Sequence, residues 1–164
     1  MPRFHIEFDP DDGSAIMPIY RPARVEELKR QAELNGFKEK SEFHVTILQP
    51  TDFTPDESNR VKAVLGSPIT DLIVSEHAIY RVVKSKIVEG TWFERESIVA
   101  RVYSDDLRRV LGRIPLVIGY SVPTPFLHVT LFTKGDNLYA PRGIGIADVA
   151  EFSQVEHHNY PPRP

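Results

Sequence analysis

Apolar and polar residues alternate along several short stretches of the chain, which is the pattern of half-buried β-strands. The first stretch is 3–8, where Phe4, Ile6 and Phe8 alternate with polar side chains. The same reasoning predicts strands at residues 69–75, 78–83, 98–103, 114–119 and 146–152. The charged stretch 84–95 is interpreted as a loop or hairpin tip, and the Pro-rich end, 157–164, as loose.

Three other stretches combine the apolar spacing of a helix with residues that begin or end one. They predict helices over 22–36, 54–66 and 104–112. The second has the clearest start, because Thr54 can cap the helix and Glu57 can complete a capping box. Short helices mixed with many strands indicate an α+β fold.

One apolar strand pattern occurs twice, and it differs from the others. Residues 43–48 read Phe-His-Val-Thr-Ile-Leu, and residues 127–132 read Leu-His-Val-Thr-Leu-Phe. In each copy a His and a Thr interrupt a run of apolar residues that favour a pleated strand. A single His-x-Thr triplet carries little information. Two copies inside matching apolar strands indicate a functional pair.

The strand geometry places each His beside its Thr. Residues i and i+2 share a face about 7 Å apart at the Cα atoms, so His44 and Thr46 point one way, and His128 and Thr130 repeat the arrangement. If the two strands lie side by side, two imidazoles and two hydroxyls line one cleft. The alternative is that both His are half-buried strand residues hydrogen-bonded to their neighbours. The repetition favours function.

Composition narrows the chemistry that this arrangement can perform. The 164 residues predict one domain, 1–164, and contain no Cys, which excludes disulfides, zinc-thiolate sites and a Cys nucleophile. Imidazoles with pKa values near 6.5 suit general acid–base catalysis at neutral pH. Of two such imidazoles, the neutral one can take a proton from an attacking group, and the charged one can give a proton to a leaving oxygen. Each Thr hydroxyl can donate to an oxygen on which negative charge develops.

These motifs resemble those of the 2H phosphoesterase superfamily, whose motif is His, apolar, Thr or Ser, apolar, present twice. Residues 44–47 and 128–131 both fit it. The resemblance implies a two-lobed, pseudo-symmetric fold of antiparallel sheets with outer helices and a central cleft. It also implies a phosphodiesterase that opens a 2′,3′-cyclic phosphate of a nucleotide or RNA end. Other possibilities are a phosphodiesterase for cyclic oligonucleotides or RNA 3′ ends, and a binding module without turnover.

A metal site is the main chemical rival, since His is a common zinc ligand. The nearest carboxylates in sequence, Glu42, Asp52 and Asp136, lack ligand spacing with the His pair. We therefore expect no metal and no cofactor.

Two further residues are candidates for substrate binding. Lys134 follows the second motif and can reach a phosphate, and Trp92, the single Trp, can stack on a base. Tyr103 and Phe132 can also stack on a base, but we expect both to pack in the core.

Charge and hydropathy set expectations for partners. The net charge is −3 and no long basic run occurs, which argues against binding of long double-stranded nucleic acid. No apolar run is long enough to span a membrane, and residues 1–12 lack the pattern of a secretory signal. A cytoplasmic monomer acting on a nucleotide or RNA-end substrate is expected.

Overall fold

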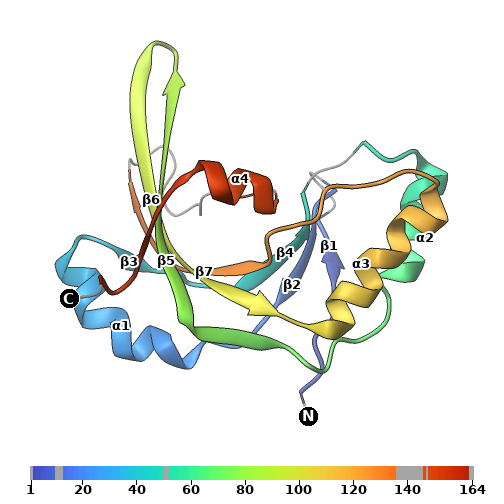
Figure 1. The fold of residues 1–164 in the computed structure, drawn as a ribbon, viewed down its shortest axis with the longest axis horizontal. Helices are drawn as coiled ribbons and strands as arrows, with labels where there is room; N and C mark the ends of the chain where they lie inside the picture. Colours follow the sequence, from blue (N-terminus) through green and yellow to red (C-terminus); the bar gives the residue numbers. More distant parts are fainter. Residues whose placement is uncertain (1, 10–12, 50–51, 136–145, 147, 163–164) are drawn as a thin grey trace.

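One antiparallel sheet joins the strands of the computed structural model, which describes residues 2–9, 13–49, 52–135, 146 and 148–162. Within those residues the eight-stranded sheet has the order β1-β2-β4-β7-β6-β5-β8, and β3 pairs with β7 (Figure 1). Its strands are β1 Glu7–Phe8, β2 Ala15–Pro18, β3 Lys38–Glu39, β4 His44–Leu48, β5 Ile73–Val88, β6 Thr91–Tyr103, β7 His128–Gly135 and β8 Glu156–Asn159. The helices are α1 Ala23–Leu34, α2 Pro55–Val64, α3 Asp105–Ile118 and α4 Val149–Gln154. The predicted α+β class is confirmed.

The two faces of the sheet are covered differently. The larger core lies between the sheet and α1, α2 and α3, and it contains Val45 and Val129 from the two central strands. A smaller cluster on the other face includes Val82, Val99 and Phe126 and packs against Phe152 of α4. Accordingly α4 and α1 lie on opposite sides of the sheet (Figure 1). No helix among the described residues is long and apolar enough to cross a membrane.

The first two predicted helices are confirmed at both ends. Pro22 is the N-cap of α1, and Asn35 is its C-cap. In α2 the capping box forms as expected: the Thr54 hydroxyl accepts from the Glu57 N–H at 3.2 Å, and the Glu57 carboxylate accepts from the Thr54 N–H at 2.9 Å.

The predicted strand at 114–119 is wrong, because α3 continues through it to Ile118. Leu107, Val110, Ile114 and Ile118 are spaced three or four residues apart and are all buried. Burying each such side chain contributes about 1.5–3 kcal/mol. Together they outweigh the cost of a proline inside a helix, about 3 kcal/mol, so Pro115 does not end α3. The helix ends instead at a glycine in the left-handed region, with φ of 83°.

The predicted loop at 84–95 is also wrong in extent. The strands of the hairpin continue to Val88 and resume at Thr91, so only Glu89 and Gly90 form the tip. Both tip residues have positive φ, the requirement of a tight two-residue hairpin turn. The strands predicted at 69–75 and 78–83 are one strand that begins at Ile73. The hairpin extends past the rest of the sheet (Figure 1), so its outer part lacks the apolar alternation of a half-buried strand.

The C-terminal predictions need correction as well. Residues 149–152, part of the strand expected at 146–152, lie instead in α4, whose N-cap Asp148 accepts from the Glu151 N–H at 2.8 Å. The end of the chain, expected to be loose, contributes β8, which pairs with β5 from Tyr80 to Val83. Strands β2 and β3 were not predicted, because their few residues are too short to show a period.

Candidate active site

The two His-x-Thr strands are neighbours in the sheet. Strands β4 and β7 pair antiparallel with Val45 opposite Val129, and both valines are fully buried in the larger core. Residues that flank a core-facing position on a strand point to the other face. The imidazoles and hydroxyls of both motifs therefore share the face opposite that core.

The register also fixes how the four side chains are arranged. Extending it by one residue each way sets His44 opposite Thr130 and Thr46 opposite His128. Side chains directly opposite have Cβ atoms about 4.5–5.5 Å apart, and diagonal neighbours are about 7–8 Å apart. The two imidazoles are diagonal neighbours, so each faces the hydroxyl of the other motif.

His128 is the more enclosed of the two imidazoles. It is 8% exposed, its ring stacks on that of Phe126 at 5.3 Å, and its Nδ1 lies 2.7 Å from the Phe126 carbonyl oxygen. A carbonyl can only accept, so Nδ1 carries a proton, and in the neutral ring Nε2 is the free acceptor. Burial lowers the pKa of His128, its hydrogen bond to the Phe126 carbonyl raises it, and the charge of His44 lowers it further.

His44 is half-buried and lies in a different electrostatic environment. Burial lowers its pKa, the charge of Lys40 lowers it further, and the carboxylate of Glu42 raises it. Lys40 follows β3, and its N–H donates to the Leu131 carbonyl on β7 at 3.0 Å. This places a cation beside the motif that the spacing of charges along the sequence did not indicate.

The two hydroxyls of the motifs are available to a ligand. Thr46 and Thr130 are half-buried, and neither side chain makes a hydrogen bond to another residue in the described part of the chain. A hydroxyl on this face can therefore donate to a phosphate oxygen without first losing a protein partner.

Arg101 on β6 is a further cation at this site, and it was not predicted from the sequence. It pairs with His128 across the β6–β7 ladder, so both side chains lie on the same face. The signal in the sequence is a lone cation within the apolar stretch 98–103. Only the strand register shows that this cation adjoins an imidazole.

Lys134 is not brought together with the two motifs. The β6–β7 register shifts between Ile98 and Val99, so Val99 is opposite Thr130 but Glu96 is opposite Lys134. This bulge turns Lys134 to the face of the larger core, although it is an even number of residues from Thr130. There its ammonium lies 3.6 Å from the Glu96 carboxylate and 5.5 Å from the centre of the Phe37 ring.

Trp92 also lies apart from the motifs. It is 63% exposed near the tip of the β5–β6 hairpin. Nine positions of β6 separate it from Arg101 (92 to 101), which is about 30 Å along a strand. Of the two rings expected in the core, Phe132 is fully buried as predicted, but Tyr103 is 42% exposed.

The described residues contain no group of three or more His, Asp or Glu side chains that could hold a metal ion. Asp136 lies outside those residues. Comparison with known proteins gave no relative: no protein-family model, no curated protein and no solved structure matches the chain.

Proposed function

We propose that this protein is a metal-independent phosphodiesterase that hydrolyses a 2′,3′-cyclic phosphate of a nucleotide or RNA end. The observation that carries the proposal is the pairing of Val45 with Val129, which sets two imidazoles and two hydroxyls side by side on one face. A phosphate placed between diagonal imidazoles has one on the side of the attacking water and one on the side of the leaving oxygen. That is the arrangement in-line displacement requires.

The tautomer of His128 suits it to act as the base. Its Nδ1 proton is held by the Phe126 carbonyl, so Nε2 can accept a proton from water as the water oxygen attacks phosphorus. The bond from phosphorus to one ribose oxygen then breaks. His44, in its charged form, gives that oxygen a proton, and the product is a nucleoside monophosphate.

Proton donation by His44 requires its imidazole to be charged, and a bound phosphate supplies negative charge that stabilises this form. It favours the charged form of a nearby imidazole and so raises a pKa that burial has lowered. The hydroxyls of Thr46 and Thr130 donate to the non-bridging oxygens, where they offset negative charge in the transition state.

The proposal includes the two-lobed, pseudo-symmetric arrangement with a central cleft that the family resemblance implies. The strand order supports it, because β4 ends one run of strands, β1-β2-β4, and β7 begins the other, β7-β6-β5-β8. Each His-x-Thr strand is thus the innermost strand of its half.

The test is a substrate panel with products identified by mass and phosphorus NMR. It contains adenosine 2′,3′-cyclic phosphate, a cyclic dinucleotide, and RNA with a 2′,3′-cyclic end, each with and without EDTA. Opening of the first or third substrate, unaffected by EDTA, is the expected result. Cleavage of only the dinucleotide would support the alternative substrate class, and binding without turnover would support the binding module. Activity that EDTA removes and zinc restores would refute the metal-independent mechanism.

A further inference from the structure

The guanidinium of Arg101 is held in an unusual setting for a cation. The side chain is half-buried, and its Cζ atom lies 5.1 Å from the centre of the Phe126 ring and 5.4 Å from that of Tyr103. Both distances are within the range of cation–π contacts. No carboxylate among the described residues forms an ion pair with it. A partly desolvated guanidinium held by rings and lacking a carboxylate is suited to an anionic ligand.

A pocket of about 400 Å³ opens directly beside Arg101. It lies between the end of β6, the side of α3 that includes Arg108 and Pro115, and the connector that leads to β7. Most of its wall is apolar, and the residues that line it include Val102, Leu111, Pro115, Val122, Pro123 and Leu127. Its volume is within the range of small-molecule sites.

Polar and aromatic groups mark the side of the pocket nearest His128. Arg101 and Tyr103 line it from the same face of the sheet as the His128 imidazole. Arg108 of α3, which lies 3.5 Å from the Asp105 carboxylate, also lines the pocket. Tyr103 presents an exposed ring on which a flat group can stack. The pocket thus combines apolar walls, a stacking platform and positive charge, and it adjoins the proposed phosphate site.

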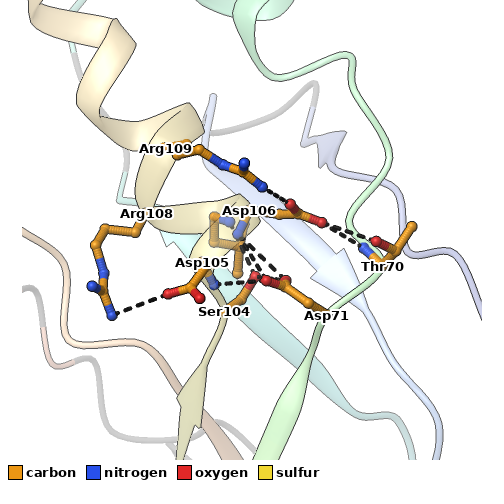
Figure 2. Close-up of polar contacts among 8 residues, drawn as sticks. Thr70, Asp71, Ser104, Asp105, Asp106, Arg108 and Arg109 are labelled. Atoms are coloured by element: carbon orange, nitrogen blue, oxygen red, sulfur yellow. Dashed lines mark hydrogen bonds and ion pairs between the residues drawn. The ribbon is translucent and has the colours of Figure 1, made fainter.

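The α3 wall of this pocket is firmly anchored (Figure 2). Asp71, just before β5, accepts from the Ser104 hydroxyl at 2.5 Å and from the Asp105 N–H at 2.9 Å. Asp106 accepts from both the N–H and the hydroxyl of Thr70, at 3.0 and 3.1 Å. The bonds to Asp71 satisfy free N–H groups at the start of α3, and both sets fix the helix to the segment that leads into β5. The pocket is therefore preformed on that side, which lowers the entropic cost of binding.

We propose that this pocket holds the base of a nucleotide whose phosphate lies at the His pair, and that Arg101 positions that phosphate. The identity of the ligand as substrate rests on the phosphodiesterase function proposed above. Arg101 pairs with His128 across the β6–β7 ladder and also lines the pocket, so its guanidinium adjoins both parts of a ligand that spans the two. A flat aromatic group fits the stacking surface of Tyr103, and an anion fits the cation beside it. A nucleotide carries both groups.

Binding measured without turnover tests the pocket. Isothermal titration compares adenosine 3′-monophosphate with inorganic phosphate, using Gly112→Met and the control Gly112→Ala. Gly112 lines the pocket, and a Cβ added there meets no atom within 4 Å, so a long side chain can occupy the space. Replacing a glycine within a helix also favours folding. We expect Gly112→Met to weaken nucleotide binding about 10-fold, the scale of a lost stacking contact, and to leave phosphate binding unchanged. Equal nucleotide affinity in the two variants would overturn the assignment of the pocket.

Arg101→Met tests the cation, with Arg113→Met as the control. Arg113 is an exposed residue of α3 that does not line the pocket. Loss of a charged hydrogen-bond donor predicts roughly 10- to 100-fold weaker binding of both phosphate and nucleotide in Arg101→Met. Arg101→Lys should recover part of the phosphate affinity, because it keeps the charge but not the planar fork. Phosphate affinity in Arg101→Met equal to that of Arg113→Met would overturn the role of Arg101.

These outcomes are separable from those of the proposed function. Nucleotide binding that responds to both substitutions, in a protein that cleaves none of the panel substrates, would retain the binding site and refute the phosphodiesterase. Cleavage of a cyclic phosphate at equal kcat/KM by the parent, Gly112→Met and Arg101→Met would retain the enzyme and refute the site.

Discussion

His44 and His128 lie diagonally across the β4–β7 pair, close enough for the charge of one imidazole to act on the other. They are not equivalent. His128 is buried with its Nδ1 on a carbonyl oxygen, whereas His44 is half-buried beside the charges of Lys40 and Glu42. This asymmetry is what a proton-transfer pair needs, because one ring must accept a proton while the other donates one.

The first prediction concerns the His pair. A positioned acid or base contributes about 10²–10⁴-fold, so His44→Ala and His128→Ala should each lower kcat by that factor on a substrate that the parent cleaves. The double variant should lose less than the product of the two, because both residues serve one proton-transfer cycle. Circular dichroism and thermal unfolding of the same samples are the controls. A single variant that unfolds, or that keeps full turnover, would show that its imidazole is structural.

The second prediction concerns the two hydroxyls. Thr46→Val and Thr130→Val keep the shape of the side chain and remove one donor to the phosphate. Each should lower kcat by about 10- to 10³-fold, comparable to or less than the loss of a donor in an oxyanion hole. Thr→Ser at the same positions keeps the hydroxyl and should retain most of the activity. If the Ser and Val variants are equally impaired, the methyl group rather than the hydroxyl is what matters at that position.

The third prediction concerns pH. Burial lowers the pKa of both imidazoles from a usual value of about 6.5. The base must be neutral, so lowering its pKa moves the acidic limb of the kcat/KM profile below pH 6.5. The imidazole that donates a proton must be charged, so lowering its pKa moves the alkaline limb of the same profile to lower pH as well. The profile of the free enzyme should therefore be a bell centred on the acidic side of neutrality.

The same reasoning predicts different pH optima for kcat and for kcat/KM. A bound phosphate raises the pKa of a neighbouring imidazole, so the optimum of kcat should lie at higher pH than that of kcat/KM. Initial rates from about pH 5 to 9 measure both. An optimum of kcat/KM above pH 7.5, about one unit past the usual pKa of His, would contradict a lowered pKa at the two imidazoles.

The fourth prediction concerns the anchor of α3. Asp71→Ala removes the acceptor of the Ser104 hydroxyl and of the first N–H groups of the helix. Loss of a helix cap predicts a decrease of about 1–2 kcal/mol in the free energy of unfolding, measured by urea denaturation. Asp105→Ala is the control, because the one ion pair of its exposed carboxylate within the described part of the chain is with Arg108 at 3.5 Å. It should change the stability by less than about 0.5 kcal/mol, and an equal effect of both substitutions would count against the cap.

The α+β class could be predicted from the sequence because local signals agreed with the structure. Thr54 and Glu57 form the capping box that their spacing predicts, and the His-x-Thr copies are strands with their valines buried. The alternation within each copy already determined that His and Thr share a face. These signals are local, since the capping box lies within residues 54–57 and a strand face is set by residues two positions apart.

What tertiary structure decided involves residues that are distant in the sequence. The period of an isolated strand cannot show which strands pair, and the register of β4 with β7 sets His44 opposite Thr130. One bulge moved Lys134 to the other face, and the ladder with β6 brought Arg101 to His128. The continuation of α3 past Pro115 likewise depended on an apolar face that gains energy only when the core covers it. The sequence alone thus determined which side chains can act and which face of its own strand each one occupies. Strand pairing determined which of them meet in one site, because its hydrogen bonds and packing form only in the folded sheet.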